Sequence, residues 1–486
     1  MPMNAPHANI ITTPAESLRA EIVVIGSGPG GAVTACLLAE AGRDIVILEE
    51  GPYHPLESCT PFSSGEMLQK YRNGGVTVAL GRPKVAYAEG RCVGGGSEIN
   101  SGLYHRTPPD VLDEWRRDFA VDALTEADLR PQFEANERDL GVCLSPGAPA
   151  PASLKLHEGA SKLGWKSVEV PRWFRYEPGA NPPRGTRQSM TKTFIPRALQ
   201  AGARLVPDTR AARLRRVGNR WQIDAQCHHQ PMRIEAEHVF VACGAIQTPA
   251  LLRRSGFKRN VGDNLHMHPT VKVVARFPGE VNALDMGVPS HQVKEFSPRF
   301  SFGCSISSPA HLALAMIDHE DGLREVDGLW RRMATYYAMT RGGVGTVRPL
   351  PFSTDPLVRY RLNNTDLGDL TEALRHLCQC LLAAGAERLY LSVAGVPCLR
   401  GGSDLNRLPQ TLSADRTSLM SIHLFSSCPM GNNRARSAVD SFGNVHDAVG
   451  LHVADASLLC GPPGVNPQGS IMAIVRRNAL KFLGKL

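Results

Sequence analysis

The stretch EIVVIGSGPGGAVTACLLAEAGRDIVILEE, residues 21–50, decides the fold. Its apolar pattern predicts a strand over 21–25, a helix over 30–41 and a second strand over 44–49, which is a βαβ unit of about 30 residues. Between the first strand and the helix lies the spacing G-x-G-x-x-G, formed by Gly26, Gly28 and Gly31. In this spacing the glycines permit a tight turn, a close approach of a pyrophosphate and close packing of helix on strand.

A carboxylate about 20 residues after the glycines accepts the hydroxyls of a ribose in such units. Glu49, at the end of the second strand, is the candidate, and its neighbour Glu50 is expected to be solvated. The free N–H groups at the start of the helix favour the phosphates of the ligand. Strand, glycines, helix and acid together predict a Rossmann-type dinucleotide site.

Composition excludes several other classes of protein. The chain has 486 residues and a net charge of +8, and its basic residues are spread along the sequence rather than massed in a stripe that would track nucleic acid. The sequence shows no apolar run long enough to span a membrane. The 12 cysteines lack metal-binding spacing, since only Cys378 and Cys380 are close, so we expect reduced, buried thiols and no metal site. With no secretory signal evident at the N-terminus, we expect a cytoplasmic protein.

Strand patterns at the start, middle and end of the chain predict an α/β fold with a discontinuous Rossmann-type cofactor domain. A second, α+β substrate domain, with a sheet backed by helices, is expected from the intervening pieces. The predicted boundaries are 1–20 for a loose N-terminal arm; 21–110, 200–268 and 421–486 for the cofactor domain; and 111–199 and 269–420 for the substrate domain.

Two further segments favour the longer cofactor FAD over a nicotinamide cofactor. The first is GRCVGGGSEINSGLYHRTPPD, residues 90–110, and the second is VACGAIQTPALLRRSG, residues 241–256. The three consecutive glycines of the first segment leave no side chain between the backbone and a flat ligand, while Ser97 and Asn100 supply polar groups.

These two segments closely resemble the two signatures of the glucose–methanol–choline (GMC) family of flavin oxidoreductases. Similar stretches are VGDNLHMHP (261–269), TKTFIPRALQAGARL (191–205) and the C-terminal region, so that the motifs occur in the family's order. Thr107 and the pair Phe257-Lys258 depart from the family pattern. The resemblance is weakest between residues 280 and 400.

The resemblance implies an FAD-binding protein and assigns further cofactor-binding residues. In the family FAD is sometimes linked covalently through a histidine of the glycine-rich loop, and Ile99 occupies that position here, so non-covalent binding is expected. Asp455 corresponds to a flavin-contacting position, and Pro467 and Gln468 would line the pyrimidine edge of the ring. The full set of expected cofactor contacts is Gly26, Gly28, Gly31, Glu49, Val93, Gly95, Ser97, Asn100, Asp455, Pro467 and Gln468.

The resemblance also implies a catalytic pair. His423, in HLFSSCPMG, and Asn466 correspond to the two active-site residues of the His/Asn subgroup that includes the cholesterol oxidases, although Ser426-Ser427 replaces the usual Gly-Thr. The other histidines of these motifs, among them His266 and His268, are expected to brace a helix end or an interdomain contact. Cys428 is expected to be a packed core residue.

The expected reaction is oxidation of an alcohol to an aldehyde or ketone. His423 would take the hydroxyl proton, because an imidazole accepts protons near neutral pH, and a hydride would pass to flavin N5. Asn466 would hold the substrate oxygen. The electron acceptor is O2 or another oxidant. Two alternatives stay open, a flavin-containing lyase without net redox and a non-catalytic flavoprotein. The sequence does not identify the alcohol, whose pocket is expected in residues 280–420.

Overall fold

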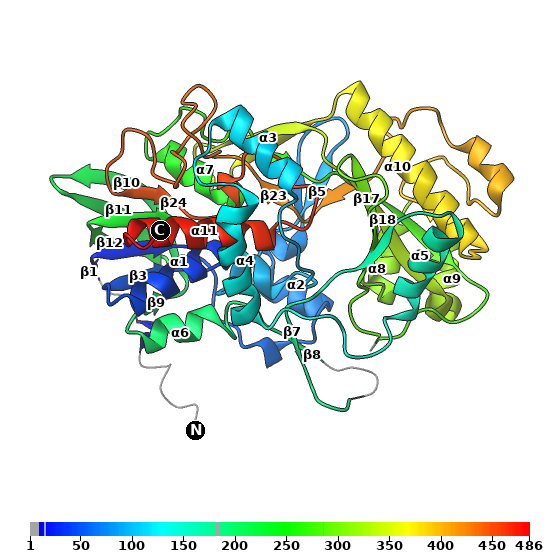
Figure 1. Cartoon of the computed structure of the whole chain (residues 1–486), viewed down its shortest axis with the longest axis horizontal. Coiled ribbons are helices and arrows are strands. Elements are labelled where there is room, and N and C mark those ends of the chain that lie inside the picture. Colours follow the sequence, from blue (N-terminus) through cyan, green and yellow to red (C-terminus); the bar gives the residue numbers. More distant parts are fainter. Residues whose placement is uncertain (1–8, 14–15, 181–184, 285) are drawn as a thin grey trace.

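A parallel sheet built from distant parts of the chain forms one half of the protein (Figure 1). The computed structural model describes residues 9–13, 16–180, 185–284 and 286–486. The five strands, in spatial order, are β24 (Leu451–Val453), β13 (His238–Val241), β2 (Ile22–Ile25), β3 (Ile45–Leu48) and β9 (Arg204–Val206). Every neighbouring pair is parallel. The runs IVVI and IVIL of β2 and β3 are buried throughout, as expected of strands covered on both faces.

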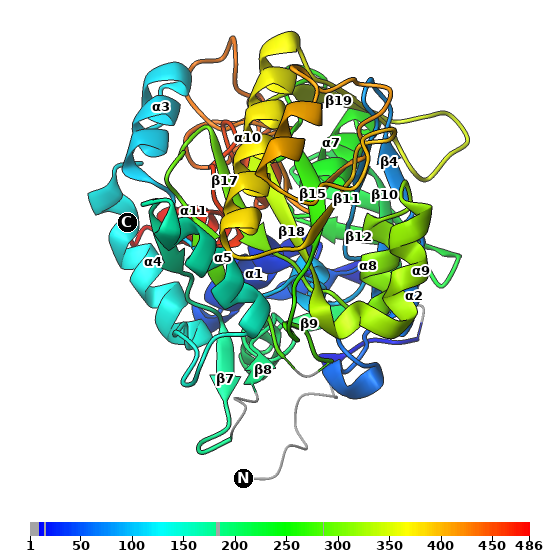
Figure 2. The same ribbon diagram turned by 90° about the vertical axis from the view of Figure 1, so that its right-hand side faces the viewer.

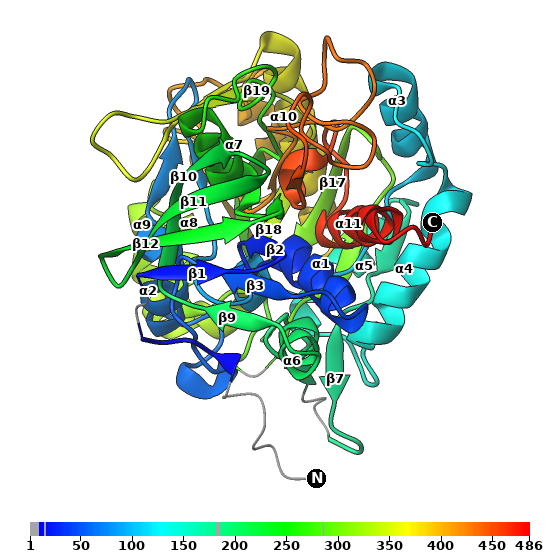
Figure 3. The ribbon, with the colours of Figure 1, turned by 90° about the vertical axis from the view of Figure 1, so that its left-hand side faces the viewer.

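Helices cover this sheet and complete the predicted βαβ unit. The helix α1 (Pro29–Glu40) connects β2 to β3 and packs against α6 (Phe194–Gln200) and α11 (Gln468–Phe482). On the outer side of α11 lies α4 (Glu126–Leu140), as Figure 3 shows. The predicted strand, helix and strand of residues 21–50 are confirmed to within one or two residues.

A four-stranded sheet extends this half of the protein. Its order is β1 (Ser17–Arg19), β12 (Gln230–Ala236), β11 (Arg220–Cys227) and β10 (Thr209–Val217). Because β1 pairs in parallel with β12, residues 17–19 are not part of a loose arm, which corrects the prediction. Ile10 also forms a bridge with Leu205. The remainder of the expected arm, residues 1–8 and 14–15, lies outside the described residues.

The other half of the protein is built on a larger, mostly antiparallel sheet. Its main path runs through β4 (Thr77–Ala79), β5 (Val85–Tyr87), β22 (Leu419–Ser421), β15 (Thr270–Arg276), β18 (Met333–Thr340), β17 (Phe300–Cys304), β16 (His291–Val293) and β6 (Ser167–Glu169). A further strand, β21 (Arg388–Leu391), pairs with β15. The helices α10 (Asn364–Ala383) and α5 (Pro151–Lys162) pack together against this sheet (Figure 2). The expected sheet backed by helices is therefore present.

The remaining elements connect or flank these two layers. The helices are α2 (Ser64–Lys70), α3 (Pro109–Phe119), α7 (Gly244–Arg254), α8 (Pro309–Ala315) and α9 (Glu320–Leu329); the strands are β7 (Phe174–Tyr176), β8 (Gly185–Arg187), β14 (His266–Met267), β19 (Val344–Arg348), β20 (Leu357–Arg361) and β23 (Leu424–Phe425). Short 3₁₀ turns include η4 (Gly95–Glu98) and η7 (Ala456–Leu458).

The two hydrophobic cores divide the chain differently from the predicted boundaries. Residues 111–140 were expected in the substrate domain, yet buried side chains of α3 and α4, such as Trp115 and Phe133, join the core around the five-stranded sheet. Conversely, Val85 and Tyr87 of β5 join the core of the large sheet, although residues 21–110 were assigned to the cofactor domain. The physical reason is amphipathic packing: α4 lies on α11, and β5 pairs with β22.

Two features of the described residues bear on other classes of protein. Among these residues, no helix is both long and apolar enough to cross a membrane. The same part of the chain contains no group of three or more His, Cys, Asp or Glu side chains placed to hold a metal ion. Cys378 and Cys380 are both buried in α10, and Cys428 is buried in the core, as expected.

Candidate functional site

The glycine turn after β2 has the close contacts that its sequence predicts. Gly26 adopts φ +105°, and a Cβ there would lie 2.2 Å from the carbonyl oxygen of Ala242 on the neighbouring strand. A Cβ on Gly31 would lie 1.9 Å from the carbonyl oxygen of Gly26, so helix and turn pack too closely for a side chain. Gly28 differs, because its nearest neighbour would be the Cα of Gly95 at 3.9 Å. Its backbone faces open space in which a ligand fits.

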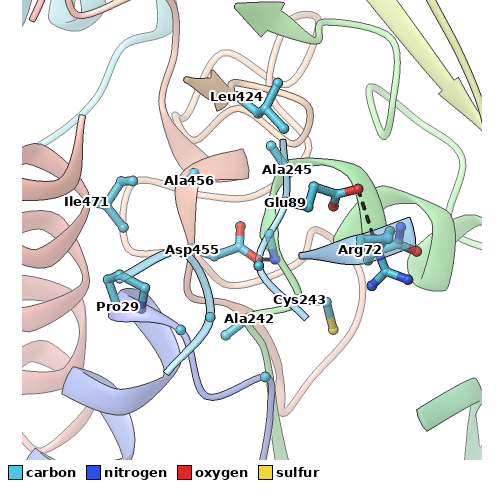
Figure 4. Close-up of a pocket in the computed structure, with 18 of the residues that line it drawn as sticks. Pro29, Arg72, Glu89, Ala242, Cys243, Ala245, Leu424, Asp455, Ala456 and Ile471 are labelled. Carbon is cyan, nitrogen blue, oxygen red and sulfur yellow. Dashed lines mark hydrogen bonds and ion pairs between the residues drawn. The ribbon is translucent and has the colours of Figure 1, made fainter. Parts of the chain in front are cut away.

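That space belongs to an elongated cavity with different chemistry at its two ends. Glycine backbones form much of the wall between the ends, and the side chains at one end include Glu49 and Arg72, while those at the other include His423 and Asn466. Figure 4 shows Asp455 near the centre of the residues drawn, with Pro29 and Ile471 to one side and with Arg72 and Glu89 beside each other on the other side. Predicted cofactor residues on the wall are Gly26, Gly28, Glu49, Gly95, Asn100, Asp455, Pro467 and Gln468.

The carboxylate of Glu49 is buried and held by backbone and side-chain donors of the turn. One oxygen accepts the backbone N–H of Ser27 at 3.1 Å and its hydroxyl at 2.7 Å, and the other accepts the N–H of Gly51 at 2.9 Å. Burial nevertheless raises the pKa of Glu49 above its ordinary value. Because a carboxylate has about four lone-pair sites, it retains capacity for a ribose hydroxyl on the cavity side.

Glu50 is not solvated, contrary to the expectation from sequence. Its carboxylate accepts from the guanidinium of Arg72 at 2.7 Å, and Arg91 and Arg210 lie within ion-pair distance. These cations hold the pKa of Glu50 below its ordinary value despite its burial. Arg72 also pairs with Glu89, whose pKa burial raises to about 7. A compact network of charges therefore closes the Glu49 end of the cavity.

The glycine-rich loop of residues 90–100 forms another part of the wall. Asn100 lies on the wall, where its side-chain amide donates to Gln468 at 2.7 Å and its carbonyl oxygen accepts the N–H of Gly102 at 3.0 Å. Val93 and Ser97 were expected to touch the cofactor, but they lie behind the wall. Val93 is fully buried in the core, and the Ser97 hydroxyl donates to the Gly94 carbonyl while accepting the N–H of Met190. Both residues support the loop from behind.

Arg187 of β8 also supports this loop, although no sequence motif points to it. Its guanidinium donates to the backbone carbonyls of Glu98 and Asn100, and it forms an ion pair with the buried Glu66 at 3.3 Å. Gly102, at the end of the loop, has no room for a side chain, because a Cβ would lie 2.4 Å from the ring of Phe174 in β7. The β7–β8 hairpin thus fixes the loop's far side.

Asp455 connects three elements in the middle of the wall. One carboxylate oxygen accepts the N–H of Gly244 at 2.8 Å and the hydroxyl of Thr248 at 2.5 Å, both at the start of α7. The other accepts the N–H and hydroxyl of Ser457 in η7. With four protein donors, Asp455 fixes the junction between β24 and α7, and burial raises its pKa.

The predicted catalytic residues meet at the opposite end of the cavity. The side-chain nitrogen of Asn466 lies 3.2 Å from Nε2 of His423, and the amide nitrogen of Gln292 donates to the carbonyl oxygen of Asn466 at 3.1 Å. The other ring nitrogen of His423, Nδ1, lies 3.0 Å from Nδ1 of His268. One continuous string of contacts is therefore formed by residues of β16, the β14–β15 connection, the β22–β23 connection and the loop before α11.

The orientation of the side-chain amides favours one proton position on His423. Since Gln292 donates to the Asn466 oxygen, the Asn466 amide presents its N–H to Nε2 of His423, which then carries a lone pair. With this lone pair, the ring proton lies on Nδ1, 3.0 Å from Nδ1 of His268. The backbone N–H of Gly464 donates to Nε2 of His268 at 3.3 Å, which favours the reverse arrangement, with a proton on Nδ1 of His268. The amide orientations therefore place the free nitrogen of His423 beside Asn466, against the preference of the Gly464 contact.

The electrostatic surroundings keep His423 neutral. Burial and the positive charge of Lys294 lower the pKa of His423 to about 3. Burial also lowers the pKa of His268 well below its ordinary value. The sequence analysis assumed the ordinary pKa of an imidazole. In the structure, burial moves the pKa of His423 far below neutral pH. At neutral pH the imidazole is in the form that accepts a proton.

The residues present fit FAD. The cavity passes over positions where a Cβ is excluded or absent, it has a buried carboxylate at the ribose end, and it leads to an imidazole and an amide at the other end. The start of α1, where Gly28 is the N-cap and no side chain caps the helix, supplies free N–H groups for a pyrophosphate. Glu49, Gly28 and Asn100 would hold successive parts of such a ligand.

Fold and site together define a dinucleotide-binding protein with a separate substrate layer. Comparison with known families gives a more specific class. The chain matches the GMC oxidoreductase family over residues 67–270 and 345–474, and an NAD(P)-binding Rossmann-like domain over residues 24–54.

The protein belongs to the GMC oxidoreductase family, whose members bind a flavin. It is 39% identical to a GMC-type oxidoreductase of Sinorhizobium fredii, with 95% of this chain and 94% of that protein covered. It is 26% identical to a long-chain-alcohol oxidase of Arabidopsis thaliana, with 94% and 67% covered. The family membership makes the protein an oxidoreductase.

Solved structures confirm the fold. Pyridoxine 4-oxidase from Mesorbium loti superposes with a TM-score of 0.72 over 96% of this chain and 99% of that one, at 16% sequence identity. A formate oxidase gives the same TM-score, also at 16% identity, over 96% of this chain and 98% of the other. The α/β architecture with a Rossmann-type layer, expected from the sequence, is therefore confirmed.

Proposed function

We propose that the protein is an FAD-dependent oxidoreductase that oxidises an alcohol, a CH–OH donor, to an aldehyde or ketone. The observation that carries this proposal is the contact between His423 and Asn466 at the end of a cavity whose other end holds the buried Glu49. A proton acceptor and an oxygen-holding amide thus face the place where a flavin ring would end. The similarity to a long-chain-alcohol oxidase supports the alcohol as the class of substrate.

The protein's residues have distinct tasks in this reaction. The lone pair on Nε2 of His423 takes the hydroxyl proton, and Nδ1–H stays donated to His268, which keeps the ring oriented. The amide N–H of Asn466 donates to the substrate oxygen and fixes it beside His423. Bound FAD supplies the acceptor for the hydride from the carbinol carbon. Because His423 is neutral down to about pH 3, we expect no loss of base function between pH 8 and pH 5.

We propose that FAD is bound without a covalent link. Ile99 stands at the position of the linking histidine of other family members, and its side chain has no group that forms such a bond. The backbone carbonyl of Ile99 accepts a hydrogen bond from the hydroxyl of Tyr71 at 3.2 Å, and this contact anchors the loop. Acid precipitation of the purified protein should release all of the yellow flavin into the supernatant. Flavin that remains in the washed pellet contradicts this proposal.

The decisive experiment is anaerobic mixing of the purified yellow protein with a panel of alcohols. We expect the flavin absorbance to bleach with at least one alcohol and to return on addition of O2 or an artificial oxidant. A lyase of the same fold would cleave a cyanohydrin without bleaching, and a non-catalytic flavoprotein would do neither. We propose O2 or another oxidant as the second substrate. We also propose that the protein is located in the cytoplasm, which fractionation of the producing cells tests.

A further inference from the structure

Strand β16 brings two long polar side chains close to the reaction end of the cavity, next to residues that line it. Gln292 donates to the Asn466 oxygen at 3.1 Å and lies 3.3 Å from the hydroxyl of Tyr337. Lys294 follows directly after the strand, and its backbone continues the ladder by donating to the carbonyl of Lys166. Since side chains two residues apart in a strand point to the same face, Lys294 extends toward the same side as Gln292, about 7 Å further along.

A buried ammonium of this region has no partner. The Nζ of Lys294 lacks a hydrogen bond to any residue that the structure describes, whereas the neighbouring side chains of Gln292 and His105 interact with each other. We refer to these three side chains as the polar cluster. In contrast, both carboxylate oxygens of Glu49 and of Asp455 accept donors from the protein. A buried ammonium without an acceptor is costly, and buried polar groups in proteins are almost always paired.

Among the residues that the structure describes, no carboxylate contributes to the pKa shifts of His423 or His105. The charged groups that influence His423 and His105 include Lys294 but no acid, and Arg341 adds a second positive charge near His268. Arg341 is already satisfied, because it forms an ion pair with Glu114 at 3.0 Å and donates to the carbonyl of Pro462. Lys294 is the cation left with free donors among the described residues near His423.

We propose that Lys294 is a specificity-determining residue whose ammonium binds a carboxylate of the alcohol substrate while the hydroxyl lies between His423 and Asn466. This inference rests on the proposed alcohol oxidation and names its substrate class, a hydroxy-carboxylate. Because Lys294 lies about 7 Å beyond Gln292 along the strand, the two functional groups are separated by a short carbon chain rather than carried by adjacent carbons. Gln292 and His105, which interact with each other beside Lys294, give the polar cluster further hydrogen-bonding groups for such a molecule.

The test compares acids with neutral molecules of the same length. Anaerobic flavin reduction is measured for 4-hydroxybutanoate, 5-hydroxypentanoate and 6-hydroxyhexanoate, and for the three corresponding primary amides. We expect kcat/KM for the best acid to exceed that of its amide by about 10- to 100-fold, the contribution of one charge-assisted pair. In Lys294→Met the ratio of acid to amide should fall to about 1, because the amide never used the ammonium.

Lys272→Met is the matched control. Lys272 of β15 is also a buried lysine whose pKa burial lowers to about 8, as it does for Lys294, but its charge influences His311 rather than the reaction end. It should keep the wild-type ratio of acid to amide. Hexanoate, which carries no hydroxyl, gives a second measurement: its titration should perturb the absorption spectrum of the oxidised flavin in the wild type, and about tenfold higher concentrations should be needed in Lys294→Met.

The possible outcomes separate the two proposals. A wild-type ratio near 1, or an unchanged ratio in Lys294→Met, overturns the assignment of Lys294 even if alcohols bleach the flavin. If no alcohol in the wider panel bleaches the flavin, the proposed oxidation fails instead. If Lys294→Met does not retain flavin, the more conservative Lys294→Gln replaces it, and the wild-type ratio together with the hexanoate titration still decides.

Discussion

The two ends of the cavity are constructed in opposite ways. At the Glu49 end, the residues come largely from one βαβ unit, and the carboxylate oxygens are held by Ser27 and Gly51 within the same stretch. At the His423 end, side chains come from four separate segments of the chain. Buried polar atoms without a partner among the described residues occur at both ends, for example on Gln247 and Arg254 near Glu49 and on Lys294 near His423. The two ends therefore differ in construction: a local stretch builds the cofactor end, whereas contacts between distant segments build the reaction end.

The largest effect is expected at the reaction end. His423→Ala should keep its flavin but reduce it about 10²- to 10⁴-fold more slowly, because a positioned base is lost. High pH should restore part of the rate, where hydroxide replaces the imidazole. Asn466→Ala should slow reduction without such rescue. Anaerobic stopped-flow absorbance measures these rates, and His157→Ala, in the exposed face of α5, is the control. A wild-type rate in His423→Ala would show that this histidine is structural.

The cofactor end should respond with a loss of binding instead of rate. Glu49→Ala removes the acceptor for the ribose and for the Ser27 and Gly51 donors, so FAD affinity should fall about 10- to 100-fold, as expected for a lost charge-assisted bond. Fluorescence titration of the apoprotein with FAD measures this. Glu50→Ala serves as the comparison, because its carboxylate is engaged by Arg72, and its effect should be smaller. Equal effects would mean that the ribose is held by neither carboxylate in particular.

A smaller effect should come from the residue that orients the base. His268→Phe removes the acceptor for the Nδ1–H of His423 but preserves a ring against Phe425, which His268 contacts edge-on. Flavin reduction should slow about three- to tenfold, the equivalent of one neutral hydrogen bond, with KM less affected than kcat. His268→Asn, which retains an acceptor, should recover part of the rate. An unchanged kcat in His268→Phe would exclude a positioning role.

The smallest expected effect concerns stability rather than chemistry. Burial lowers the pKa of His423 and His452 to about 3 and that of His266 to about 4. Their folded-state pKa values lie below the unfolded value of about 6.5, so the unfolded chain binds more protons below that pH, and each histidine costs about 1 kcal/mol between pH 6.5 and 5.5. Glu89, with a pKa raised to about 7, acts in the opposite direction by about the same amount. These four groups together therefore lower the free energy of unfolding by about 2 kcal/mol between pH 6.5 and 5.5.

Urea unfolding of the flavin-loaded protein at the two pH values measures this loss. His452→Phe is the informative variant, because the His452 ring stacks on Phe240 with centroids 4.3 Å apart, and a phenyl ring preserves that contact. Between pH 6.5 and 5.5 the variant should lose about 1 kcal/mol less stability than the wild type. Equal acid sensitivity in both proteins would contradict the assigned pKa of His452.

The two ends of the cavity also differ in how well they can be predicted from the sequence. The glycine turn and Glu49 were predictable because their geometry depends on residues close together in the chain. A backbone position with a positive φ, or without room for a Cβ, requires a glycine, which is visible in the sequence. His423 and Asn466 were found only through resemblance to a family. The partnership of His268 with His423 spans 155 positions, and no local pattern encodes such a contact.

Errors in the sequence predictions have identifiable physical causes. Glu50 was expected to be solvated because its partner Arg72 comes from a different element. Val93 and Ser97 lie in a motif that contacts the cofactor, yet the loop turns at Gly94, with φ +92°, and directs them into the core. No sequence motif points to Lys294, because a single lysine beside a strand is common. Only the structure reveals that its ammonium is buried without a partner among the described residues.

The position of β24 and α11 in the sequence has a consequence for biosynthesis. The edge strand of the parallel sheet is residues 451–453, and Gln468, which contacts Asn100, begins the helix that follows. A ribosome adding about 5–20 residues per second exposes the βαβ unit early but completes its sheet only after most of the chain has been made, roughly 25–90 s later. During that interval the half-formed sheet has an open edge at β13. FAD capture by the nascent chain must therefore wait for translation of the last strand and helix.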